Sequence, residues 1–158
     1  MPAERIVVGV DGSEEARAAL VWAVREARVR HAVVEAVCAW SLSLLWALGI
    51  RLSAVHDPFV AFQEAKEIIG REVALAQSEL DERVPVEQSA IEGSPAEVLV
   101  EASRHASLLV VGARGAGGLR QIGLGSVSHH CAEHALCPVV VFRRQPVVPV
   151  AEALGPTG

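Results

Sequence analysis

The sequence predicts an α/β fold in which helices cover both faces of a parallel β-sheet. Short β-branched runs alternate along the chain with longer segments of helical spacing, and this order is typical of parallel strands joined by crossover helices. Val33–Trp40 shows no alternation of apolar and polar residues, as expected of a strand buried on both faces. The 158 residues, 51% of them hydrophobic, are enough for one domain with a substantial core.

The first strand and helix are predicted near the N-terminus. Arg5–Val10 is a β-branched run that ends at Asp11 and Gly12. Ser13 is a suitable N-cap, because its hydroxyl can accept from an unpaired N–H of the first helical turn. The apolar residues that follow keep helical spacing: Ala16, Ala19, Leu20, Ala23, Val24 and Ala27.

The next segments are a strand, an apolar stretch and a long helix. Val33–Trp40 is the second strand, and Ser41–His56 after it could be a short helix or an apolar lid. A surface segment this apolar would normally be covered by a partner subunit or a ligand. Asp57 followed by Pro58 is typical of a helix start, and the apolar stripe continues to about Arg83.

The second half of the chain continues the alternation. Val84–Ile91 partly alternates and is predicted to be an edge strand. Ser94–Glu97 forms a capping box with proline at the first helical position, and predicts a helix to about His105. The remaining elements are a strand at Leu108–Val111, a helix at Ser126–Ala135 and a strand at Val139–Phe142.

A glycine-rich loop joins the fourth strand to the last helix. A strand followed by such a loop and a helix is typical of phosphate binding, because the N–H groups of a helix N-terminus are unpaired and glycine lets a ligand approach the backbone. Ser126 and Ser128 add hydroxyl donors. A tight turn would need fewer glycines than this loop has: Gly112, Gly115, Gly117, Gly118, Gly123 and Gly125.

Three stretches resemble the nucleotide-binding universal stress proteins. Gly112-x-x-Gly115, nine residues and Gly125-Ser126 are similar to the family's G-x2-G-x9-G-[S/T] signature. Val7–Ser13 resembles the family's first strand and turn, and Cys137–Arg143 its last strand, so the resemblance spans residues 5–143. It implies an adenine-nucleotide α-hydrolase-like, Rossmann-like sheet of five strands in the order 3-2-1-4-5. In that order Asp11 and Gly112 flank one crevice at the carboxyl ends of neighbouring strands, where such sheets bind ligands.

The resemblance also implies the residues that contact a nucleotide. Val10 and Asp11 would meet the adenosine, although Asp11 could also be a turn-forming carboxylate. Ala39 would offer backbone contacts to adenine, at a position where the family often has valine. Arg114 and Arg120 could add charge, but loop arginines are more often only solvated. Ribose and phosphates would lie against Val111, Gly112 and Gly115, and phosphate against Gly125, Ser126, Val127 and Ser128.

The ligand implied is ATP or another adenine nucleotide, with any Mg²⁺ held through the phosphates. Its occupancy would act as a conformational or partner switch in a stress response, with at most slow hydrolysis. The chain has no G-x4-G-K-[ST] motif, its one lysine is Lys66 in a predicted helix, and no residue is a convincing general base. The alternatives are a structural homodimer that binds no nucleotide and, with less support, a nucleotide hydrolase.

A homodimer is the expected assembly. Val139–Phe142 is an apolar edge strand that needs cover, and the family pairs this strand with its copy. The net charge of −5 gives no basic face for nucleic acid, and the apolar run near residues 36–50 is too short for a membrane span. Three cysteines form no even disulfide framework and no signal peptide is apparent, so we expect a cytoplasmic protein.

Two further expectations concern domains and metals. Without an internal repeat, residues 1–145 should form a single domain, followed by a proline-containing tail at 146–158. A cluster of possible ligands lies near the last helix, but no second ligand pair such as C-x2-C accompanies it, and an ordinary helix surface is expected. Its members are His129, His130, Cys131, His134 and Cys137.

Overall fold

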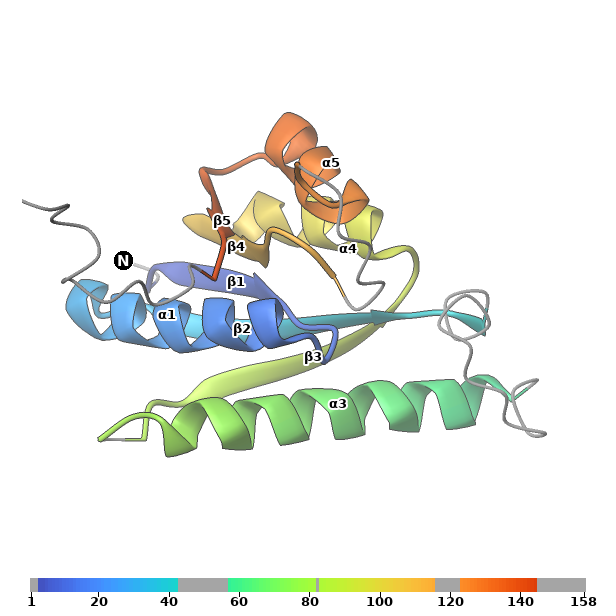
Figure 1. Ribbon diagram of the computed structural model, residues 1–158, viewed down its shortest axis with the longest axis horizontal. Coiled ribbons are helices and arrows are strands. Elements are labelled where there is room, and N and C mark those ends of the chain that lie inside the picture. The colour runs from blue at the N-terminus through green and yellow to red at the C-terminus, as the bar shows by residue number, and fades with distance from the viewer. Residues whose placement is uncertain (1–2, 43–56, 82, 116–122, 145–158) are drawn as a thin grey trace, which may run out of the picture.

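The computed structural model describes residues 3–42, 57–81, 83–115 and 123–144, and within these ranges five parallel strands form one sheet in the order β3-β2-β1-β4-β5. The predicted fold class and strand order are therefore confirmed (Figure 1). The strands are β1 (Arg5–Gly9), β2 (Val33–Trp40), β3 (Val86–Glu92), β4 (Leu108–Gly112) and β5 (Val139–Phe142).

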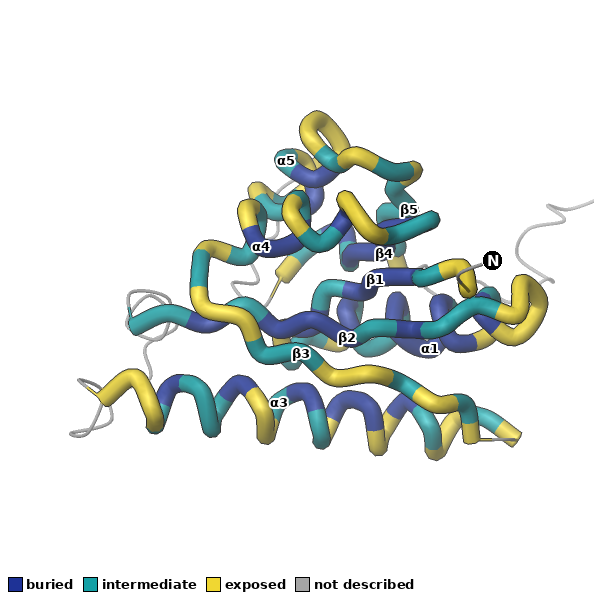
Figure 2. The backbone as a smooth tube through the Cα atoms, turned by 180° about the vertical axis from the view of Figure 1, so that it is seen from behind, coloured by how far each residue is buried: buried dark blue, intermediate teal, exposed yellow. Residues whose placement is uncertain are grey.

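Helices cover both faces of the sheet, as predicted. One layer holds α1 (Glu14–Arg30) and α3 (Pro58–Ser78), and the other holds α4 (Pro95–Ala102) and α5 (Ser126–His134), with a short 3-10 helix, η1 (Ser103–His105), after α4 (Figure 1). Figure 2 shows that the buried positions of α3 recur along its length, facing the sheet.

The core has two halves because successive strand residues point to opposite faces of the sheet. Ile6 and Val8 of β1 pack into the cluster with α1 and α3, whereas Val7 belongs to the cluster with α4 and α5. All three side chains are fully buried. This explains why the central strands β1 and β4 have continuous apolar runs.

Local capping chemistry fixes where three of the helices begin. Ser13 Oγ accepts from Ala16 N at 3.2 Å, and Asp57 Oδ1 accepts from Phe59 N at 2.9 Å. In the predicted capping box, Ser94 Oγ accepts from Glu97 N at 3.4 Å. Each side chain satisfies an N–H group that has no partner within its helix.

The prediction for the end of α3 was wrong, because the helix stops at Ser78 and not near Arg83. The Gln77 side chain pairs with the backbone of Val84, whose N–H donates to Gln77 Oε1 at 3.1 Å and whose carbonyl accepts from Gln77 Nε2. The backbone of Val84 is thus bonded to a side chain and not to a helical backbone group, and the chain leaves the helix toward β3. Pro85 then precedes the first residue of the strand.

Arginine side chains hold a buried carboxylate between α1 and α3. Glu72 is fully buried, and its oxygens accept from Arg17 Nε at 2.6 Å, Arg17 Nη2 at 3.1 Å and Arg71 Nε at 3.2 Å. Burial alone would raise the pKa of Glu72, but the hydrogen bonds and charges of Arg17 and Arg71 outweigh it and lower that pKa below its usual value. The carboxylate is therefore ionised and joins the two helices.

Some predictions fall outside the described residues. These include most of Ser41–His56, of which Ser41 and Leu42 are described, together with Gly117, Gly118, Arg120 and the tail 146–158. No helix in the part of the chain that the structure describes is both long and apolar enough to span a bilayer.

Candidate functional site

The carboxyl ends of β1 and β4 lie side by side, since Val8 pairs with Val110 in the parallel ladder. Asp11 follows β1, and its Oδ1 accepts from Ser13 N at 2.9 Å, so the carboxylate does form the turn into α1. Its other oxygen, Oδ2, faces the glycine loop, where a Cβ atom on Gly115 would lie only 2.8 Å away. The turn-forming and the site-facing interpretations of Asp11 are thus compatible.

The first turn of α1 packs directly against the start of the glycine loop. A Cβ atom on Gly112 would lie 3.1 Å from Ala16 N and 3.2 Å from the Glu15 carbonyl carbon, so a side chain there would press on the backbone of α1. In addition, Glu15 Oε2 accepts from Arg114 N at 2.7 Å. Glu15 is not among the site residues predicted from the sequence, because an acidic residue in the first turn of a helix is ordinarily explained by its favourable interaction with the helix dipole.

The two ends of the glycine loop are hydrogen-bonded to each other. The Ala113 carbonyl accepts from Gly125 N at 2.7 Å and from Ser128 Oγ at 2.9 Å. Ser128 Oγ also lies 3.0 Å from the Gly125 carbonyl, and the residue is 2% exposed. The Ser128 hydroxyl therefore joins the two ends of the loop through the carbonyls of Ala113 and Gly125. This role differs from the phosphate contact that the family resemblance implies.

The N-terminus of α5 lacks the side-chain cap that α1, α3 and α4 have. Gly125 is its N-cap residue and provides no side-chain hydrogen bond. Ser126 is exposed and Val127 is half-buried, and within the described residues no group accepts from the N–H groups of Ser126, Val127 or Ser128. A Cβ atom on Gly125 would lie 3.2 Å from the Ala113 carbonyl oxygen. Such an end carries partial positive charge and favours an anion.

The other residues implied by the family resemblance surround the same edge of the sheet. Val10 and Val111 are buried at the strand ends, with exposed fractions of 4% and 3%, so they can offer backbone atoms more readily than side chains. The pairing of β1 with β2 ends at Gly9 and Val37, and Ala39 lies in the part of β2 that extends past β1. The Arg114 guanidinium, half-buried, forms no ion pair with any described residue.

The Cys38 thiol is buried in the core cluster that contains α1 and α3. Burial, and then the charge of Asp11, raise the pKa of the Cys38 thiol to about 11. Because a thiolate is needed for nucleophilic attack, this cysteine is a core residue and gives the crevice no covalent chemistry.

The histidines of α5 lie on its surface. His129 Nε2 and His134 Nε2 are 3.5 Å and 3.9 Å from Glu133 Oε2, and the rings of His130 and His134 are 4.4 Å apart. Cys131 is fully buried, and burial raises its pKa to about 11. Among the described residues, no three His, Cys, Asp or Glu side chains are placed to hold a metal ion.

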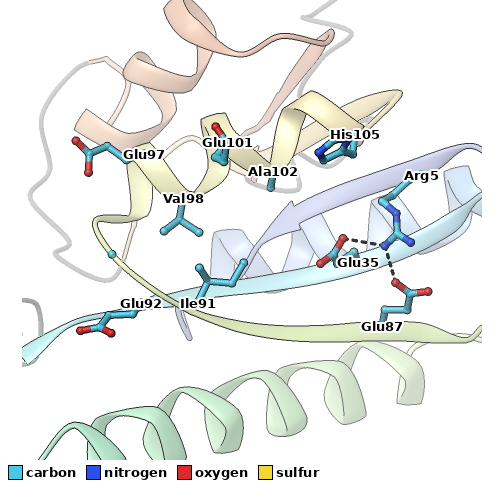
Figure 3. Close-up of a pocket in the computed structure, with 11 residues that line it drawn as sticks. Arg5, Glu35, Glu87, Ile91, Glu92, Glu97, Val98, Glu101, Ala102 and His105 are labelled. Carbon is cyan, nitrogen blue, oxygen red and sulfur yellow. Dashed lines mark hydrogen bonds and ion pairs between the residues drawn. The ribbon is translucent and has the colours of Figure 1, made fainter.

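A groove of about 830 Å³ lies elsewhere, between the β2–β3 edge of the sheet and α4 (Figure 3). Arg5 Nη1 crosses it to Glu35 Oε2 at 2.8 Å and Glu87 Oε2 at 2.5 Å. Its other charged lining includes Glu92, Glu97 and Glu101, which would repel phosphate. None of the described residues of the glycine loop lines it, so the candidate nucleotide site is the crevice at Asp11 and not this groove.

Comparison with known proteins agrees with this geometry. Residues 2–143 match the Universal stress protein family. The chain belongs to this family. Universal stress protein Rv2005c of Mycobacterium tuberculosis is 36% identical over 140 residues, which cover 88% of this chain and 45% of that protein. The chain thus spans about half the length of the curated universal stress proteins that it matches.

Solved universal stress proteins share the fold. The protein from Archaeoglobus fulgidus in complex with dAMP is 24% identical, with a TM-score of 0.65, and the match covers 90% of this chain and 99% of that one. Another universal stress protein, solved in complex with cAMP, is 24% identical, with a TM-score of 0.56 and coverage of 89% and 97%.

Proposed function

We propose that this protein binds an adenine nucleotide in the crevice between the Asp11 turn and the glycine loop. The observation that carries the proposal is the uncapped N-terminus of α5, which follows a glycine loop whose two ends are hydrogen-bonded together. Phosphate oxygens would accept from the N–H groups of Ser126, Val127 and Ser128, and from Ser126 Oγ. The dAMP and cAMP complexes of family members with the same fold support an adenine nucleotide as the ligand class.

The remainder of the ligand would lie across the strand ends. Asp11 would meet the adenosine near its base or ribose, beside Val10, and Ala39 would face adenine from the overhanging part of β2. Val111, Gly112 and Gly115 would line the ribose and phosphates. Arg114 would add positive charge, since no described residue neutralises its guanidinium.

ATP is the nucleotide that we propose, with Mg²⁺ coordinated by its phosphates. Occupancy then acts as a conformational or partner switch in a stress response, with at most slow hydrolysis. Phosphate contacts made mainly by backbone N–H groups suit binding more than phosphoryl transfer, which uses a lysine and a positioned base or water. The site as described contains neither lysine nor histidine.

The same proposal includes a cytoplasmic homodimer that forms through β5. The carbonyls of Pro138 and Phe142 face β4, where they accept from Leu109 N and Ala113 N at 3.0 Å and 2.8 Å. Because this pattern alternates along a strand, the backbone groups of Val139 and Val141 point away from β4. A second copy of β5 would pair with them and cover the edge.

The test is a calorimetric titration of the purified chain with ATP and Mg²⁺, beside a variant carrying both Gly115→Asp and Ser126→Ala. The aspartate places a second carboxylate beside Asp11 Oδ2, and the alanine removes an exposed hydroxyl at the α5 N-terminus. We expect micromolar binding that the double variant loses. No binding by the wild-type chain would contradict the proposal and favour the structural homodimer.

A further inference from the structure

Two carboxylates face the start of the glycine loop from the same side. Asp11 Oδ2 lies against Gly115, and Glu15 Oε2 accepts from Arg114 N at 2.7 Å. Glu15 is half-buried, and its backbone lies against Gly112, so the first turn of α1 fixes where its side chain begins. An N–H group at the edge of a candidate phosphate site is therefore already occupied by an anion of this chain.

This arrangement has an electrostatic consequence for any ligand of the loop. A phosphate near Arg114 must either displace the Glu15 carboxylate from the N–H group or remain close to a like charge. A unit charge about 6 Å away, at an effective dielectric constant of about 40, changes affinity roughly tenfold. Asp11 adds to the same repulsion, and the Arg114 side chain opposes it. The repulsion grows with the net negative charge of the ligand.

We propose that Glu15 is a specificity-determining residue of the nucleotide site, selecting ligands by their net charge. It disfavours metal-free ATP relative to AMP and to ATP neutralised in part by Mg²⁺. This inference rests on the proposed function, since it concerns the same crevice. Beyond that function, it assigns to Glu15 the selection of the charge form in which the nucleotide is bound.

A conservative variant separates charge from geometry. Glu15→Gln keeps a side-chain oxygen that can accept from Arg114 N and removes the negative charge. Glu14→Gln is the matched control: it makes the same change in net charge one residue earlier, but Glu14 is exposed and its Oε2 pairs with Arg144 Nη1 at 2.8 Å. Both residues lie in the first turn of α1, so both variants change the helix dipole interaction alike.

The experiment measures the Kd of AMP, of ATP with Mg²⁺ and of ATP with EDTA, at constant ionic strength, for the wild-type chain and both variants. We expect Glu15→Gln to tighten metal-free ATP about tenfold more than it tightens AMP or Mg²⁺-bound ATP, because metal-free ATP carries the larger net negative charge. We expect Glu14→Gln to change each Kd by less than about twofold, because an exposed charge is screened.

Three results would overturn the inference. The first is a change of all three affinities by the same factor in Glu15→Gln, which is what a purely structural role produces, and the second is the same effect in Glu14→Gln. A loss of Mg²⁺-bound ATP alone would instead make Glu15 a metal ligand. If the wild-type chain binds none of the three ligands, the proposed function fails as well, whereas binding without charge selection removes this inference alone.

Discussion

The Oδ2 atom of Asp11 lies 2.8 Å from the point at which a Cβ atom on Gly115 would sit. Real Cβ atoms essentially never approach a neighbouring atom this closely, so a side chain at residue 115 would make the Asp11 carboxylate or the loop shift. This contact joins the turn after β1 to the loop after β4. Glycine at this position of the signature leaves space for the Asp11 carboxylate at the edge of the crevice.

Replacing Gly115 with alanine should therefore weaken nucleotide binding without unfolding the chain. The new methyl group forces Asp11 or the loop to move by a few tenths of an ångström, and we expect the Kd for ATP to rise about tenfold or more, as one misplaced contact of about 1.4 kcal/mol does. Gly70→Ala is the control, because the nearest atom to its Cβ position is Gln88 Oε1 at 3.9 Å. The control should bind normally and gain up to about 1 kcal/mol of stability from helix propensity. Unchanged binding by Gly115→Ala would contradict the role of this contact.

The hydroxyl of Ser128 should matter for stability as well as for binding. Ser128→Ala leaves the buried Ala113 carbonyl with one donor fewer, and we expect a loss of about 1–2 kcal/mol in the free energy of unfolding, measured by urea denaturation. Ser126→Ala, at an exposed position, should change stability by less than about 0.5 kcal/mol and reduce ATP affinity directly. Equal stability losses in the two variants would show that Ser128 does not hold the loop.

The buried Glu72 should make stability depend on pH. Because its folded pKa lies below the usual carboxyl value of 4.5, its stabilising contribution is fully present above pH 4.5 and is lost as the pH falls through the folded pKa. At pH 7 we expect Glu72→Gln to lower the free energy of unfolding by about 2 kcal/mol, since charge-assisted hydrogen bonds to two arginines are weakened.

The measurement compares urea unfolding of Glu72→Gln and the wild-type chain at pH 7 and at pH 3.5, where the difference should shrink. Glu101→Gln is the control: the ion pair of Glu101 with Arg104 is exposed, and its loss should cost less than about 0.5 kcal/mol. A difference for Glu72→Gln that is the same at both pH values would show that ionisation of Glu72 does not stabilise the fold.

A proline at residue 141 tests the proposed dimer. The N–H group of Val141 points away from β4, so Val141→Pro removes a donor only from the outer edge, where proline is tolerated. We expect a dimer for the wild-type chain at micromolar concentration and a folded monomer for the variant, by analytical ultracentrifugation with circular dichroism. Val140→Pro removes an N–H group that faces β4 and should instead destabilise the fold. A wild-type monomer would refute the proposed assembly.

The elements that sequence reasoning located well are those fixed by neighbouring residues. Ser13, Asp57 and Ser94 cap helices through contacts two or three residues away, and these were predictable. The strand order came from the family resemblance and not from the residues, because pairing between distant strands leaves no local pattern. The end of α3 was missed because it depends on the Gln77 side chain meeting a backbone seven residues later.

The candidate site likewise combines features that depend on neighbouring residues with features that depend on distant ones. The glycine signature predicted where the candidate site lies, since glycine spacing is a local feature, and phosphate binding there stays a prediction. Glu15 was missed because its partner, Arg114, is 99 residues away. The internal hydrogen bond of Ser128 was missed because the sequence cannot distinguish a hydroxyl that faces a ligand from one that faces the Ala113 carbonyl.

Phosphate binding at the N-terminus of α5 is tested most directly by the amide chemical shifts of ¹⁵N-labelled protein during an ATP–Mg²⁺ titration. We expect the largest saturable shifts at Gly115, Ser126, Val127 and Ser128, and small ones at Glu87 and Glu97 in the acidic groove. Shifts concentrated in that groove, or no shifts at the start of α5, would contradict it.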